Sequence, residues 1–157
     1  MKPPSKLVVE RSTPGPLVDR MAFMAATGTG WLNILPEIPD DVPVPPTPSS
    51  FAVFSKRGPV VPLATWTAPA ISGRRIEPAQ VGVQHGIARP VAKRLVDTPA
   101  AVPAGWRQLQ DHARRGLVVV PPPGEPLAAV AGWIMAVLEE LCIPPHTTRF
   151  EVYVYEP

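Results

Sequence analysis

The sequence predicts an α+β protein in which helices pack on one face of an antiparallel sheet. Between residues 79 and 156, strand and helix periodicities follow in the order strand, helix, strand, strand, helix, strand. Prolines and glycines separate these segments where the chain must turn. A hydrophobic fraction of 45% in 157 residues is enough to build a substantial core.

The preceding residues predict an ordered segment followed by a proline-rich arm. Within residues 1–35, residues 6–11 have the pattern of a short strand, and residues 16–26 form a helical pattern that starts with a proline. Residues 36–50 hold six prolines and no helical or strand period. They therefore predict an extended linker or a surface-wrapping arm.

The main domain is expected to span residues 51–157 and to open with a hairpin. Residues 51–66 alternate, turn at the sequence KRGP and continue in strand-forming residues. Residues 71–77 are polar and turning. We expect the hairpin to be added to a core formed by residues 79–156.

The first half of that core contains a strand, a short helix and a hairpin. Residues 80–85 alternate, and residues 88–97 have apolar side chains four apart with a proline near the start. Residues 105–111 and 117–120 are expected to pair through the turn DHARRG, whose aspartate and glycine suit a hairpin. A helix over residues 106–113, capped by the same glycine, is the alternative.

The second half contains the strongest helix and a final strand. Residues 126–142 place large apolar side chains at helical spacing, with Pro126 at the start and Pro144 and Pro145 as a stop. Residues 149–155 (RFEVYVY) alternate as a half-buried strand. The six elements have the order of a ferredoxin-like βαββαβ domain, with two helices on one face of the sheet. This order implies no function, because unrelated functions share that fold.

The composition of the sequence indicates the cellular compartment in which the protein is expected. The longest apolar run, residues 127–138, is shorter than the about 20 residues that span a bilayer, and no signal-peptide pattern opens the sequence. The single cysteine, Cys142, fits a reducing compartment. We therefore expect a cytoplasmic protein without a membrane partner.

Nucleotide and nucleic-acid sites are disfavoured. The GTGWLN sequence at residues 28–33 lacks the third glycine of a dinucleotide motif. The prolines of PPPGEP at residues 121–126 lack the N–H groups that cradle a phosphate. The strand at residues 117–120 is aliphatic, whereas strands that bind single-stranded RNA use aromatic rings for stacking. We expect no cofactor and no nucleic-acid partner.

The predicted topology gathers basic and imidazole side chains at one end of the sheet. Residues 72–116 carry eight basic and three acidic residues, although the net charge is only +2. The candidate residues for binding a small anion or an acidic protein partner are His85, Arg89, His112, Arg114 and Arg115.

A metal site is a weaker alternative at the same end. It would use two or three of His85, His112 and His146, but no two of them have ligand spacing. Catalysis by Cys142 is disfavoured, because the C-terminal end of a helix opposes formation of the thiolate.

The strongest helix also predicts a surface for self-association. Trp133, Met135 and Ala136 lie on its second face, which is more apolar than contact with solvent requires. That face must meet either the amino-terminal arm or another subunit. The functional hypothesis is therefore a non-enzymatic binding or assembly module. The alternative is a small enzyme or a metal- or ligand-binding domain with its site at the histidine-bearing end.

Overall fold

The computed structural model of this protein describes residues 2–44 and 58–157. In chain order its elements are β1 (Ser5–Glu10), α1 (Gly15–Thr27), β2 (Trp31–Pro36), β3 (Leu63–Thr67), β4 (Ala70–Ser72), β5 (Arg75–Glu77), β6 (Gln80–Gln84), α2 (Ala92–Leu95), β7 (Arg107–His112), β8 (Gly116–Val120), α3 (Leu127–Leu141) and β9 (Arg149–Tyr155).

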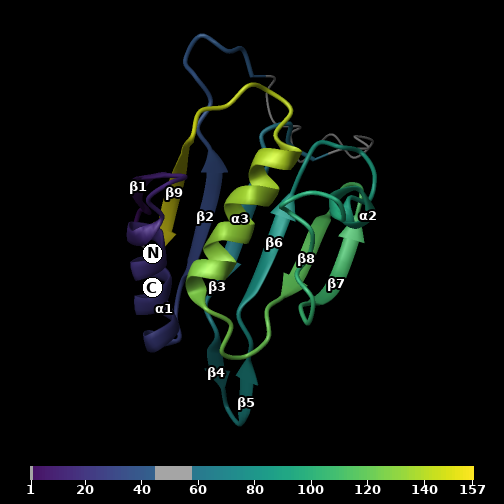
Figure 1. The fold of residues 1–157 in the computed structure, drawn as a ribbon. Coiled ribbons are helices and arrows are strands. Elements are labelled where there is room, and N and C mark those ends of the chain that lie inside the picture. The colour runs from purple at the N-terminus through teal and green to yellow at the C-terminus, as the bar shows by residue number, and fades with distance from the viewer. Residues whose placement is uncertain (1, 45–57) are drawn as a thin grey trace.

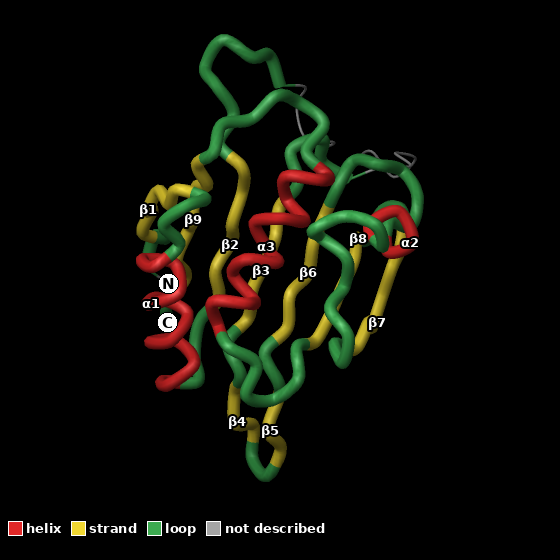
Figure 2. Tube along the Cα trace, viewed as in Figure 1, coloured by secondary structure: helices red, strands yellow, loops and turns green. Residues whose placement is uncertain are grey.

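Seven of the strands form one antiparallel sheet in the order β1-β9-β2-β3-β6-β8-β7. Figure 1 shows α3 running across the middle of this sheet, with α1 beside it and α2 near β7 and β8. The two remaining strands, β4 and β5, form a small hairpin that projects from one end of the sheet, as the tube in Figure 2 also shows.

The alternation of apolar residues along each strand produces the core. Every second side chain of β2, β6 and β9 is buried on the face that carries the helices. Register joins these side chains into a row in which each residue pairs with the next: Leu7, Val152, Ile34, Ala64, Val83 and Leu117. A second row consists of Val154, Leu32, Trp66, Val81 and Val119.

The opposite face of the sheet is more polar and partly exposed. On that face Thr65 donates a hydrogen bond of 2.8 Å to the Asn33 Oδ1 atom. The rings of Trp31 and Tyr155 stack there with their centroids 5.0 Å apart.

The ferredoxin-like arrangement is wrong. In that fold the final strand would neighbour the first strand of the core, but β2 and β3 lie between β9 and β6. The sheet therefore has seven strands and not four, and β1 continues it beyond β9. The error arose because residues 31–36 were not predicted as a strand, whereas the apolar side chains of β2 complete the central rows.

Several predicted elements are confirmed at the local level. The hairpin of β7 and β8 is present, so residues 106–113 are not a helix. The patterns assigned to α1, α3, β6 and β9 also form the expected elements. The helix expected at residues 88–97 is reduced to α2.

The hairpin expected at residues 51–66 is only partly testable. Its first strand, residues 51–55, lies outside the described residues. Its second half overlaps β3, which pairs with β2 and β6. The arm expected at residues 36–50 has neither helix nor strand over residues 37–44, where it is described.

The predicted interface on α3 is also corrected. Trp133, Met135 and Ala136 are buried inside the chain. The Trp133 indole donates hydrogen bonds of 3.0 Å and 3.2 Å to the carbonyl oxygens of Ala100 and Ala101, and α1 packs along the helix. The contacts that cover α3 therefore come from α1 and from the loop at Ala100 and Ala101, and not from residues 36–44 of the expected arm.

Within residues 2–44 and 58–157 there is no helix with the length and apolar character needed to cross a membrane.

Because β8 lies close to β6 at Gly116, we predict that a side chain at this position destabilises the fold. A Cβ atom there would overlap the Val83 carbonyl oxygen, and the residue has φ 87°. Gly105 has a similar φ of 85° but open space around it. We expect Gly105→Ala to lower the free energy of unfolding by about 1–2 kcal/mol through backbone strain alone, and Gly116→Ala by roughly 3–5 kcal/mol. Urea denaturation of both variants measures the difference, and equal losses would contradict the tight contact.

Candidate functional site

The residues predicted to form a basic site do not share one environment. His85 follows β6 and is only 1% exposed, whereas Arg89, His112, Arg114 and Arg115 are exposed. These four side chains lie in the loop before α2 and at the turn between β7 and β8. The structure therefore leaves basic groups at this end of the sheet but separates them from the buried imidazole.

His85 is held by the backbone around it. Its Nδ1 atom accepts the Ile87 N–H at 3.3 Å, so the proton of the neutral ring lies on Nε2. The Nε2 atom is buried and has no hydrogen-bond partner among the described residues. Burial lowers the pKa of His85 from 6.5, and the Asp111 carboxylate opposes this shift. The His85 ring therefore lies inside the chain, whereas the Arg89 and Arg115 side chains are exposed.

His112 and His146 are also engaged locally. The Nδ1 atom of His112 accepts the N–H groups of Arg114 and Arg115, both at 3.1 Å, and so closes the turn between β7 and β8. His146 precedes β9, where its Nδ1 atom lies 2.8 Å from the Thr147 carbonyl oxygen. In the part of the chain that the structure describes, no three His, Cys, Asp or Glu side chains are grouped to hold a metal ion.

Asp111 caps the start of α2. Its two oxygens accept the N–H groups of Val91 and Ala92 at 2.8 Å and 3.0 Å. These hydrogen bonds also tie β7 to α2.

Cys142 has the properties of an inactive thiol. It lies at the C-terminal end of α3 and donates a hydrogen bond of 3.4 Å to the Pro144 carbonyl oxygen. Burial raises the pKa of its thiol from 9.0 to about 11. The thiolate needed for nucleophilic attack is therefore scarce at neutral pH.

A pocket at the opposite end of the sheet offers a better-formed site. Its volume is about 400 Å³. Three chain segments enclose it: the β8–α3 loop with the start of α3, the β4–β5 hairpin with its flanking prolines, and the end of α1. Its lining residues are Ala25, Trp66, Pro69, Ile76, Pro78, Ala79, Pro121, Pro122, Pro123, Gly124, Glu125, Leu127 and Val130.

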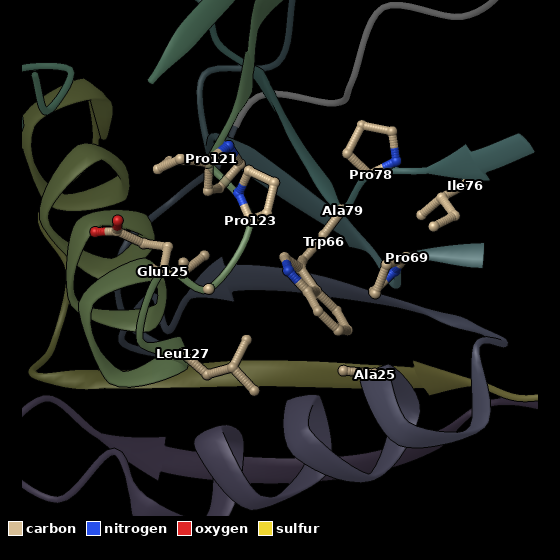
Figure 3. Close-up of a pocket in the computed structure, with 13 residues that line it drawn as sticks. Ala25, Trp66, Pro69, Ile76, Pro78, Ala79, Pro121, Pro123, Glu125 and Leu127 are labelled. Carbon is tan, nitrogen blue, oxygen red and sulfur yellow. The ribbon is translucent and has the colours of Figure 1, made fainter. Parts of the chain in front are cut away.

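Prolines give this pocket its rigid walls. Pro69 and Pro78 flank the β4–β5 hairpin, and Pro121 to Pro123 lead from β8 toward α3. Figure 3 shows the rings of Pro69, Pro78, Pro121 and Pro123 with Ile76 around the indole of Trp66. Because proline fixes φ and has no N–H donor, such walls are both stiff and apolar.

Trp66 supplies the one polar group at the floor of the pocket. Its side chain belongs to the second core row and is fully buried. In Figure 3 the indole nitrogen lies on the side of the ring that faces the loop of Pro123 and Glu125. The Nε1–H has no hydrogen-bond acceptor among the described residues. An unpaired buried donor is unfavourable by about 1–3 kcal/mol, and the fold carries this cost because other atoms of the chain cover the Trp66 nitrogen.

Among the described residues of the lining, Glu125 is the only one with an ionisable side chain. It lies partly exposed at the pocket edge, on the loop between β8 and α3. One carboxylate without a second acid, a base or a nucleophile beside it gives no catalytic pair. The arrangement suits the binding of a neutral apolar group, and Glu125 disfavours an anion at the entrance.

The sequence analysis did not predict this pocket, although it considered two of the segments that line it. The PPPGEP segment was tested only as a phosphate site, and residues 71–77 were taken as a turn. The signal that could have found the pocket is the recurrence of proline directly before and after strands, at Pro69, Pro78 and Pro121.

No family model, curated protein or solved structure matches this chain. The functional argument therefore rests on the geometry of the pocket.

The Asp111 contact predicts a stability change. Asp111→Ala removes both acceptors at the start of α2, so we expect the free energy of unfolding to fall by about 1–2 kcal/mol. Asp111→Asn retains one acceptor and should cost less. Asp97→Ala, which removes an exposed carboxylate just beyond α2, is the control in chemical denaturation. An Asp111→Ala variant as stable as the control would refute the contact.

His85 predicts a pH dependence with a definite sign. Because its folded pKa lies below 6.5, the unfolded chain binds the proton first on acidification. The neutral ring is therefore fully compatible with folding above pH 6.5, and stability falls as the pH decreases below that value. Urea denaturation between about pH 7.5 and about pH 5 should show this loss, and His85→Gln should reduce its slope. His112→Gln is the exposed control, and an unchanged slope in His85→Gln would contradict the assignment.

Proposed function

We propose that this protein is a non-enzymatic binding module whose ligand is a small, neutral and predominantly apolar molecule. The observation that carries the proposal is the proline-walled pocket with the unpaired Trp66 indole at its floor. Its volume of about 400 Å³ lies in the range of pockets that hold small molecules. Apolar lining with few polar groups is also typical of such sites.

The chemistry of the lining narrows the ligand class. Pro121, Leu127 and Val130 favour an aliphatic or aromatic body. The buried Trp66 ring lies beneath this lining and adds to its apolar character. Glu125 at the edge selects against a negatively charged ligand and tolerates a donor group at the outer end.

The pocket supports binding over catalysis. A general acid or base needs a partner within hydrogen-bond reach, and the lining has one ionisable group. An anion site at His85, Arg89, His112, Arg114 and Arg115 has lost its main support, because His85 is buried and Asp111 caps α2. We retain a cytoplasmic location as part of the proposal, since a lone thiol suits a reducing compartment.

Binding of a neutral fluorophore tests the proposal. Phenylnaphthylamine should bind the wild-type protein with increased emission, and Ala79→Phe should weaken its affinity by about tenfold or more, because the added ring occupies pocket volume. Leu127→Trp provides a second pocket-filling variant. Ala104→Phe adds the same ring at an exposed position outside the lining and should leave affinity unchanged.

Circular dichroism of each variant checks that it folds. Wild-type protein that does not bind the dye, or equal affinities for Ala79→Phe, Leu127→Trp and Ala104→Phe, would reject the pocket as the binding site.

A further inference from the structure

The β4–β5 hairpin carries an unusual pair of exposed isoleucines. Ile71 is 80% exposed and Ile76 is 78% exposed, more than any other large hydrophobic side chain in the described residues. The two residues are directly opposite in the register of the hairpin, so they form one apolar face. A turn through Gly73 and Arg74 joins the strands, and Figure 1 shows the hairpin projecting beyond the end of the main sheet.

This apolar face continues into the pocket described above. Ile76 lines the pocket, and Ile71 lines a neighbouring depression beside the end of α1. The two hollows share Ala25, Pro69 and Ile76. The hairpin and the pocket mouth therefore belong to one continuous apolar surface, which is the kind of surface that marks an interaction site.

Charges on this surface are complementary but do not pair within the chain. Arg74 and Arg75 lie at the tip of the hairpin, and Glu125 lies at the pocket edge. None of the three has an ion-pair partner among the residues that the structure describes. A partner that brings a carboxylate to the arginines and an arginine to the carboxylate would satisfy all three.

We propose that this surface binds a second copy of the chain about a two-fold axis. A two-fold interface places the same patch on both subunits, so each patch must be self-complementary. This patch has that property, because it combines an apolar projection with an apolar hollow and basic with acidic groups. Ile71 and Ile76 of each subunit cover the pocket mouth of the other, and each Glu125 faces the arginines of the other hairpin.

The dimer would also close the pocket around a ligand, and this inference rests on the proposed function. In this dimer the partner's isoleucines lie over the pocket mouth and supply a wall that one chain lacks. A bound apolar ligand is then shielded from water on all sides, and its affinity depends on association.

Sedimentation equilibrium tests the association. We expect a mass near twice the 16.9 kDa of one chain for the wild-type protein. Ile71→Glu should raise the dimer dissociation constant by about a hundredfold or more, because symmetry introduces each substitution twice. Ile71→Val should preserve the dimer. Leu109→Glu, at a leucine that is 52% exposed on β7, is the control for adding charge elsewhere.

A charge exchange tests the orientation of the two copies. Arg74→Glu with Arg75→Glu, or Glu125→Arg alone, should each weaken the dimer by about tenfold or more. Combining the three substitutions should restore association, since the pairs across the interface are then reversed. A monomer at every concentration up to about 1 mM, or a dimer that Ile71→Glu leaves intact, would overturn the proposal.

Dye binding separates this inference from the proposed function. Ile71 is outside the pocket lining, so a monomeric Ile71→Glu protein should still bind phenylnaphthylamine, with affinity reduced by about tenfold. A wild-type protein that is monomeric and binds the dye would reject the dimer and support the pocket as the ligand site. A dimer that Ile71→Glu dissociates but that binds no dye would support the interface and remove the ligand site.

Discussion

Two rows of apolar side chains cross the sheet beneath α3, and the rest of the structure depends on their burial. The rows contain residues from β2, β3, β6, β8 and β9, so no single hairpin could build them. Burial of each large side chain contributes roughly 1.5–3 kcal/mol, which makes these rows the dominant stabilising contact. The helix that covers them is itself buried on most of its surface, because α1 and the loop before β7 enclose its second face.

The same packing gives the two ends of the sheet different chemistry: one end is polar and the other is apolar. At the end that carries His85, Asp111 and the turn of β7 and β8, hydrogen bonds engage the Nδ1 atoms of His85 and His112 and both oxygens of Asp111. At the other end, the chain enters α3 through a segment with four prolines that offer no N–H donors. The wall formed there is apolar, and Trp66 of the second row becomes its floor. The pocket thus results from the proline-rich loop through which the chain passes from β8 to α3.

The local sequence pattern predicted the type of most elements well, but it did not predict which strands are neighbours in the sheet. The alternation of residues 149–155 and the helical spacing of residues 126–142 correspond closely to β9 and α3. The pairing of β9 with β1 and β2 joins residues more than a hundred positions apart, and no periodicity records such a partner. The surroundings of the candidate site residues could not be predicted for a similar reason, since the burial of His85 and the cap formed by Asp111 depend on contacts between separate elements.

The sequence by itself determined an α+β composition, the hairpin around Gly116, the start of α3 at a proline and the apolar faces that must be hidden. These properties follow from backbone preference and side-chain period, which act over a few residues. Only the tertiary structure decided that seven strands share one sheet, that the chain itself covers Trp133 and that prolines from three loops meet above Trp66. These outcomes are set by which distant surfaces fit together, because burial of apolar area is non-directional and does not specify a partner until the whole chain packs.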